Sequence, residues 1–144
     1  VYRYTGRELP NALQLARRLL VNILLGNGDA HLKNWTLMYP DTITPELAPA
    51  YDIVFTRAYI PNEQQFALNL GKNKHWYRAG FEHFQVWAAR AGIPWRAVEA
   101  QLKDTLERAR TLWPSHLQQL PMADDHKAAL VEHWRSLSAD FRVG

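Results

Sequence analysis

The stretch that decides the fold is GNGDAHLKN, residues 26–34, a polar run that directly follows a long apolar segment. Glycine, asparagine and aspartate favour turns, because glycine tolerates unusual backbone angles and the short polar side chains hydrogen-bond to nearby backbone groups. The run therefore predicts a loop, called the polar loop below. Its side chains Asp29, His31, Lys33 and Asn34 stand between apolar elements, and polar loops held in this way often carry function.

Upstream of the polar loop, residues 11–25 have the pattern of a buried helix. Apolar side chains recur there at steps of three and four residues, with Pro10 near the start and Gly26 at the end. The longest apolar run, Leu19 to Leu25, is broken by Asn22. It is far shorter than the roughly 20 residues that a membrane span needs, so no membrane segment is expected.

Downstream of the polar loop, residues 35–47 predict one small β-hairpin. The first half of this segment favours a strand, Pro40 and Asp41 predict a turn, and Pro45 confines the returning strand to a sheet edge. The mixed polar and apolar segment 50–55 predicts either a short strand or an extended loop.

The C-terminal half is expected to be helical. Regular apolar spacing predicts one helix over 81–91, a longer helix from Pro94 that Trp113 and Pro114 close, and a last helix from about Asp124, a good N-cap residue, to about Leu137. These elements together predict a mainly α fold, with residues 1–144 forming a single domain.

The composition fits one globular domain. Of the 144 residues 47% are hydrophobic and 22% charged, which allows a real core and excludes disordered and fibrous chains. The absence of cysteine excludes a disulfide scaffold, a thiol nucleophile and cysteine-based metal sites, and fits a reducing compartment. No two of the six histidines have the H-x-x-x-H spacing of a zinc site. We expect His116 and His133 to be partly buried or surface side chains.

Two basic segments each have a functional and an ordinary interpretation. The whole net charge of +3 falls in residues 1–40, where an anionic ligand would be favoured, although Arg17 and Arg18 are also typical of a solvated helix face. The basic and aromatic segment 72–78 suits nucleic acid or an acidic partner, but is also typical of a surface turn.

The spacing of three polar residues suggests phosphoryl transfer. Asp29 and Asn34 are five residues apart, as are the catalytic aspartate and the magnesium-binding asparagine of many phosphotransferases, and Asp52 follows after the predicted hairpin. Mg²⁺ prefers oxygen ligands, which Asn34 and Asp52 supply. Asp29 would accept the proton of the attacking hydroxyl or orient that hydroxyl. Lys33 and His31 are the cations of the loop that could stabilise phosphate.

The segments NGDAHLKN (27–34) and LAPAYDI (47–53), with Trp35 just after the first, resemble the paired signature of HipA-type serine/threonine kinases. These kinases are the toxins of bacterial toxin–antitoxin modules. The resemblance implies a kinase-like C-terminal lobe, mainly α, with one small β-hairpin next to the catalytic loop. It also implies a role for each matched residue: Asp29 is catalytic, Asn34 and Asp52 bind Mg²⁺, and His31, Lys33 and Tyr51 contact ATP.

The resemblance further implies a cytoplasmic kinase that is linked to persistence and phosphorylates a protein serine or threonine, with an aminoacyl-tRNA synthetase as the substrate that the family suggests. A HipB-like antitoxin would be its partner, and DNA would be contacted only through that antitoxin. The chain contains no G-x-G-x-x-G, and only 28 residues precede Asp29, so the nucleotide-clamping N-terminal lobe is expected to be absent from it. We therefore expect the isolated chain to be inactive.

Two alternatives remain open at this stage. One is a non-catalytic kinase-like module that binds an antitoxin or another protein, with a vestigial metal site. The intact set Asp29, Asn34 and Asp52 argues against it, because a decayed site would be expected to lose at least one member. The other is a basic helical nucleic-acid domain, which rests only on the charge distribution and on segment 72–78.

Overall fold

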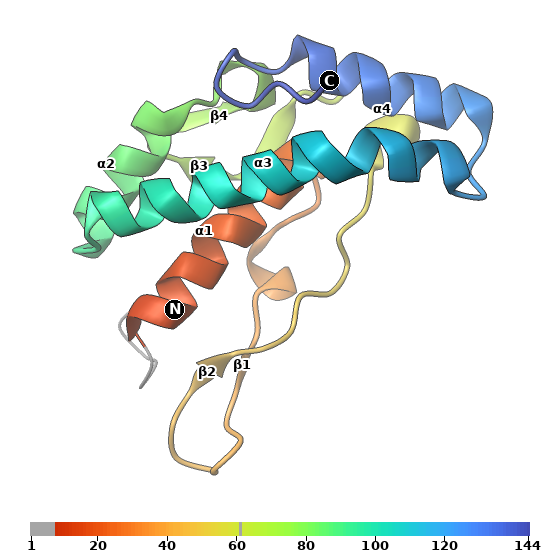
Figure 1. Ribbon diagram of the computed structural model, residues 1–144. Coiled ribbons are helices and arrows are strands. Elements are labelled where there is room, and N and C mark those ends of the chain that lie inside the picture. The colour runs from red at the N-terminus through yellow and green to blue at the C-terminus, as the bar shows by residue number, and fades with distance from the viewer. Residues whose placement is uncertain (1–7, 61) are drawn as a thin grey trace.

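The computed structural model describes residues 8–60 and 62–144, and these ranges form a mainly helical fold with two small antiparallel hairpins (Figure 1). The helices are α1 (Glu8–Leu24), α2 (Phe81–Ala91), α3 (Trp95–Gln119) and α4 (Asp124–Ser136). The strands are β1 (Leu37–Met38), β2 (Glu46–Leu47), β3 (Gln65–Leu70) and β4 (Asn73–His75). Short 3₁₀ turns η2 (Leu32–Asn34), η3 (Thr56–Ala58) and η4 (Trp76–Arg78) join them. The prediction of a mainly α fold is confirmed.

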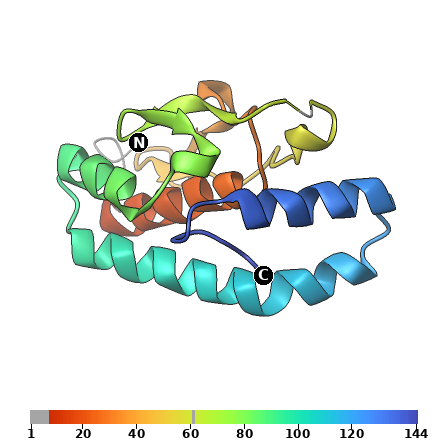
Figure 2. The ribbon, with the colours of Figure 1, turned by 90° about the horizontal axis from the view of Figure 1, so that it is seen from above.

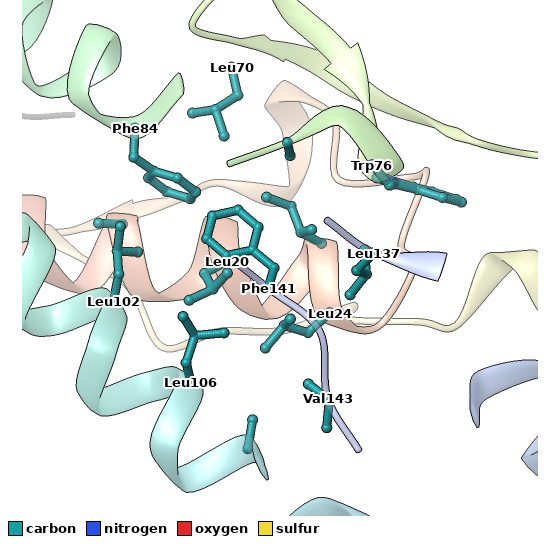
Figure 3. Close-up of a cluster of buried hydrophobic side chains, with 14 of the residues drawn as sticks. Leu20, Leu24, Leu70, Trp76, Phe84, Leu102, Leu106, Leu137, Phe141 and Val143 are labelled. Carbon is teal, nitrogen blue, oxygen red and sulfur yellow. The ribbon is translucent and has the colours of Figure 1, made fainter. Parts of the chain in front are cut away.

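Helix α1 is the central element of the helical body. It packs along α3, and Figure 2 shows it between α3 and the β3–β4 hairpin. Its buried side chains Leu20 and Leu24 enter one cluster with Leu106 of α3, Phe84 of α2 and Phe141 of the C-terminal segment (Figure 3). Each such side chain contributes about 1.5–3 kcal/mol when it is fully buried. The element that leads into the polar loop is thus firmly anchored in the core.

The predicted hairpin at 35–47 is present but shorter than expected. Strands β1 and β2 pair only at Leu37 with Leu47 and at Met38 with Glu46, and the hairpin projects away from the helices (Figure 1). Its turn is held by Asp41, whose carboxylate accepts hydrogen bonds from the Ile43 and Thr44 amides. Hydrogen bonds from Thr44 and Ile43 lower the pKa of Asp41 to about 2. Segment 50–55 is a loop and contains no strand.

A second hairpin, β3–β4, was not predicted. Its two-residue turn places both Gly71 and Lys72 at positive φ, +55° and +73°, as a type I′ turn requires. Lysine is not a typical residue for the second position, so the turn gives little sequence signal. The segment 72–78 is therefore not a simple surface turn. Trp76 is fully buried and cannot stack on a nucleic-acid base, whereas Lys72 and Lys74 are exposed.

The prediction that Trp113 and Pro114 close the long helix is wrong. Helix α3 continues through Pro114 to Gln119, because Leu117 beyond the proline is buried and the Trp113 ring packs 6.2 Å from that of Trp134. The last helix begins as expected, but Ala123 takes the N-cap position. Asp124 lies in the first turn, where a carboxylate favours the helix dipole.

No helix in the described ranges combines the length and the apolarity that crossing a bilayer requires. The 25-residue α3 is long enough, but it is amphipathic, with one face in the core and the other carrying charged residues.

Candidate functional site

The polar loop starts where α1 ends, and side chains of α4 secure that end. Nε2 of His133 lies 2.8 Å from the Ile23 carbonyl oxygen, and the Trp134 indole N–H donates to the Leu24 carbonyl at 2.9 Å. The last carbonyls of a helix have no hydrogen-bond donor within it, so these bonds satisfy buried polar groups. Helix α4 thereby fixes the point from which the polar loop departs.

His133 is fully buried, so the prediction of a partly buried or surface residue is wrong for it, whereas His116 is exposed. Burial is tolerated because both ring nitrogens have partners, Nδ1 lying 3.2 Å from the Tyr77 hydroxyl. Burial lowers the pKa of His133 to about 4, so the ring is neutral at neutral pH. The ring packs against Gly26, whose φ is +58° and where a Cβ would lie 3.2 Å from Cε1 of the histidine.

Two buried asparagines join α1, the polar loop and the segment around Asp52. Asn22 of α1 donates to the Arg18 carbonyl at 2.7 Å and accepts from Nδ2 of Asn27 at 2.6 Å. The Asn27 carboxamide also accepts from the Asp29 amide at 3.0 Å and donates to the Asp52 carbonyl at 3.4 Å. One side chain thus contacts the backbone of both aspartates that the sequence singled out.

Asp29 projects from the polar loop with its side chain 62% exposed, and its carboxylate oxygen lies 3.6 Å from Nε2 of His31. Its carbonyl accepts a hydrogen bond of 2.8 Å from Nδ2 of Asn34. The Trp35 indole donates to the Ala30 carbonyl at 3.2 Å and closes the end of the loop. The carboxylate is therefore accessible, while the backbone that carries it is held from both sides.

Asn34, Tyr51 and Asp52 line one small cleft, which we call the Asp52 cleft; Arg18 of α1 lines it as well. Asp52 adopts a left-handed backbone with φ of +55°. The Tyr51 hydroxyl donates to the Lys33 carbonyl at 2.9 Å and thereby joins this segment to the polar loop. The structure thus brings the two predicted metal ligands and one predicted nucleotide contact to one place.

His31 and Lys33 lie on a different surface. Together with Leu32 and Leu68 they line an open hollow beside the polar loop, and neither lines the Asp52 cleft. The nucleotide contacts predicted for His31, Lys33 and Tyr51 are therefore divided between two neighbouring surfaces.

The oxygen atoms of the Asp52 cleft suit a hard cation such as Mg²⁺. The Asn34 amide nitrogen donates to the Asp29 carbonyl, and its Oδ1 has no hydrogen-bond partner among the described residues, so it is available to a ligand. Within residues 8–60 and 62–144, the Asp52 carboxylate has no hydrogen bond or ion pair, and no three histidine, aspartate or glutamate side chains cluster as a metal site. One carboxylate and one amide oxygen match Mg²⁺, which takes few protein ligands when phosphate supplies the others.

The segment after Asp52 folds back onto the polar loop. The Thr56 hydroxyl accepts the Gly28 amide at 2.8 Å and is hydrogen-bonded to the Glu63 carboxylate. That carboxylate occupies the space beside Gly28 where a Cβ would lie. Arg57 then donates to the Ala129 carbonyl of α4 at 2.9 Å. Thr56 and Arg57 thus join the chain after Asp52 to both the polar loop and α4.

The two arginines of α1 differ in their surroundings. Arg17 is paired with Asp104 at 2.7 Å, so its charge is balanced within the domain. Arg18 donates to the Ala48 carbonyl at 2.6 Å and lines the Asp52 cleft, where burial lowers its pKa. It is not simply part of a solvated face. Arg3 and Arg7, which also contribute to the predicted basic segment, lie outside the described residues.

No role at the site was predicted for Arg18, Asn22 or Asn27. A signal existed for Asn22, the single polar residue inside an apolar run. A buried amide at such a position needs partners, so it indicates a specific hydrogen-bond network. Arg18 and Asn27 have no comparable signal, because an arginine on a helix and an asparagine in a loop are common.

Comparison with known proteins identifies the family. Residues 2–113 match the family model of the HipA-like C-terminal domain. "Putative kinase Y4dM" of Sinorhizobium fredii is 39% identical over 149 residues, covering 95% of this chain and 36% of that protein. "Putative kinase Y4mE" of the same organism is 32% identical over 91 residues, covering 63% of this chain and 21% of that protein.

The fold is also that of a solved HipA. HipA of Shewanella oneidensis MR-1, determined with HipB and operator DNA, matches with a TM-score of 0.74 and 21% identity, over 94% of this chain and 34% of that chain. The chain spans about a third of the length of Y4dM and of this HipA. Since the family match covers most of the chain and extends over both the polar loop and the Asp52 cleft, the chain belongs to the HipA-like C-terminal domain family.

Proposed function

We propose that this domain is the catalytic lobe of a HipA-like protein kinase, which transfers the γ-phosphoryl group of ATP to a serine or threonine hydroxyl of a protein. The observation that carries the proposal is the Asp52 cleft. Asn34 and Asp52, each of which carries a side-chain oxygen able to bind a cation, line it together, and the accessible carboxylate of Asp29 projects from the same polar loop as Asn34. The names of the Sinorhizobium relatives support the kinase assignment.

Each side chain has a role in this proposal. Asn34 and Asp52 would hold Mg²⁺, which neutralises phosphate charge when it is bound. Asp29 accepts the proton of the attacking hydroxyl as the new phosphorus–oxygen bond forms and the bond to the leaving ADP breaks. His31, whose Nε2 lies 3.6 Å from the Asp29 carboxylate, contacts the nucleotide next to that carboxylate. Lys33 and Tyr51 contact the nucleotide from the two surfaces beside the loop.

The assigned roles can be tested in the complete gene product with labelled ATP. We expect Asp29→Asn and Asp52→Asn to lower the rate of phosphoryl transfer by at least about a hundredfold, because each removes a carboxylate that acts at the reacting groups. Asp125→Asn, an exposed aspartate in the first turn of α4, is the charge-matched control and should retain the activity. Retained activity in both site variants would refute the assignment. Aminoacyl-tRNA synthetases, the substrates suggested by the family resemblance, are the first proteins to supply.

We further propose a HipB-like DNA-binding antitoxin as the partner, with DNA contacted only through it. The support is the Shewanella structure, in which HipA is found with HipB and operator DNA. The same partnership would suit a non-catalytic binding module. The Asp52→Asn protein separates the two: a kinase loses phosphoryl transfer but still captures the antitoxin, whereas a binding module shows no transfer even before substitution.

A further inference from the structure

We propose that Asn27 is a positioning residue, which holds the backbones of Asp29 and Asp52 in a fixed relation and thereby sets the affinity of the Asp52 cleft for Mg²⁺. The inference rests on the proposed function, since it assumes that the cleft binds a divalent cation. It deepens that function by assigning a role to a side chain that would not itself touch metal, nucleotide or substrate.

The Asn27 carboxamide is hydrogen-bonded to the backbone of both aspartates. Its Oδ1 accepts from the Asp29 amide at 3.0 Å, and its Nδ2 donates to the Asp52 carbonyl at 3.4 Å. No other side chain in the described ranges hydrogen-bonds to the backbone of both aspartates. The two segments are far apart in sequence, so this amide is a direct link between the polar loop and the residue expected to bind metal.

Asn27 is itself anchored to the core through Asn22 of α1. Asn27 is 1% exposed and Asn22 is 7% exposed. Asn22 accepts from Nδ2 of Asn27 at 2.6 Å, and its own carbonyl accepts the Asn27 amide at 2.9 Å. Since Asn22 lies on α1, the central helix of the body, the orientation of the Asn27 side chain is determined by a rigid element. Buried amides keep such bonds because unpaired polar groups are unfavourable in the interior.

The backbone of Asp52 has an uncommon conformation. Its φ of +55° lies in the left-handed region, which aspartate adopts more readily than most residues other than glycine but still at some cost, so contacts to this backbone help to hold it. The hydrogen bond from Asn27 holds the Asp52 carbonyl in one direction. The Asp52 side chain is attached to the same Cα, so the direction of its carboxylate depends on this backbone orientation. Replacing a residue that holds a metal ligand in place without itself touching the metal commonly lowers metal affinity about ten- to hundredfold.

The test uses Asn27→Ala and the isosteric Asn27→Asp in the complete gene product. Aspartate keeps an oxygen for the Asp29 amide but has no N–H for the Asp52 carbonyl. We expect both variants to need about ten times more free Mg²⁺ for half-maximal phosphoryl transfer, and to bind Mn²⁺ about ten times more weakly in the presence of ADP.

The matched control is Asn11→Ala. Asn11 is also a buried asparagine of α1, 8% exposed, and its Oδ1 accepts the Leu47 amide at 3.3 Å, but it contacts neither aspartate. This variant should lose stability without any change in the Mg²⁺ requirement. Folded Asn27 variants with wild-type Mg²⁺ and Mn²⁺ affinities would overturn the proposal.

A separate readout distinguishes this inference from the proposed function. Hydrogen exchange of the Asp29 amide needs neither nucleotide nor turnover, and it should accelerate in Asn27→Ala but not in Asn11→Ala. If the unsubstituted protein transfers no phosphate, the proposed function fails, whereas the exchange and Mn²⁺ measurements still test the positioning role. Unchanged Asp29 exchange in Asn27→Ala would show that the link does not hold the loop.

Discussion

At the scale of single residues, Gly26 is subject to two independent constraints. Its φ is +58°, and the His133 ring occupies the space into which a side chain would extend, with Cε1 only 3.2 Å from a Cβ. We expect Gly26→Ala to lower the free energy of unfolding by about 1–3 kcal/mol, since alanine is strained at positive φ and must also displace the ring. Urea denaturation of the variant and the unsubstituted protein measures this difference.

Gly92 provides the control for this prediction. It has a similar φ of +69° at the end of α2, but no atom lies within 4 Å of the position that a Cβ would take there. Gly92→Ala therefore bears the backbone strain alone and should cost less stability than Gly26→Ala. Equal losses at the two positions would mean that the histidine contact does not contribute.

His133 makes the stability of the domain sensitive to acid. Burial lowers its pKa to about 4, and the nearby positive charge of Arg57 acts in the same direction. An unfolded chain binds a proton at the ordinary pKa of about 6.5, so stability is retained above that pH and falls as the pH drops towards 4. The loss that this residue contributes amounts to about 3 kcal/mol at most.

The contribution of His133 is measured as a difference between variants. Unfolding free energies of the unsubstituted protein and of His133→Gln are compared from pH 7.5 to pH 5, and the slope should be smaller in the variant. His116→Gln, which replaces an exposed histidine, should keep the original slope. A His133→Gln protein with undiminished pH dependence would contradict the role given to this ring.

At the scale of elements, α3 depends on contacts beyond its internal proline. Leu117 is 3% exposed and lies after Pro114, so the last turns of the helix are held by burial rather than by intrinsic preference. Leu117→Ala should lower the free energy of unfolding by about 2–4 kcal/mol. Leu112→Ala on the same helix, where the side chain is 45% exposed, should have a much smaller effect. Chemical denaturation distinguishes them, and similar losses would refute this account of α3.

The contrast between local sequence preference and tertiary burial also explains which elements could be predicted from the sequence. Helices α1 and α2 were predicted close to their observed positions, because their apolar periodicity is clear and Gly26 and Gly92 follow them. The end of α3 was missed because tertiary burial of Leu117 outweighs the local effect of Pro114. The β3–β4 hairpin was missed because its turn places Lys72 at positive φ, which no local preference favours.

At the scale of the whole molecule, the site could be predicted only in part. The spacing of polar residues predicted Asn34 and Asp52 as ligands of one metal ion, and the structure places both residues at one cleft. The support for the polar loop could not be predicted, because it comes from distant parts of the chain. His133 and Trp134 contact the end of α1 across 110 residues, and no local pattern encodes such contacts. Asn27 and Asp52 are separated by 25 residues and a hairpin.

The last prediction concerns how much of the proposed kinase site this domain contains. In the proposed function Asp29 and the residues of the Asp52 cleft belong to this domain, whose sequence contains no G-x-G-x-x-G loop to cover the phosphates. Phosphoryl transfer depends on positioning as much as on charge, so a nucleotide that is held only at its metal would react poorly. We therefore expect residues 1–144, expressed alone, to transfer no phosphate to protein under conditions in which the complete gene product does. A thermal unfolding transition measured on the same sample confirms that the protein is folded, and robust transfer by the folded domain alone would show that it contains a complete active site.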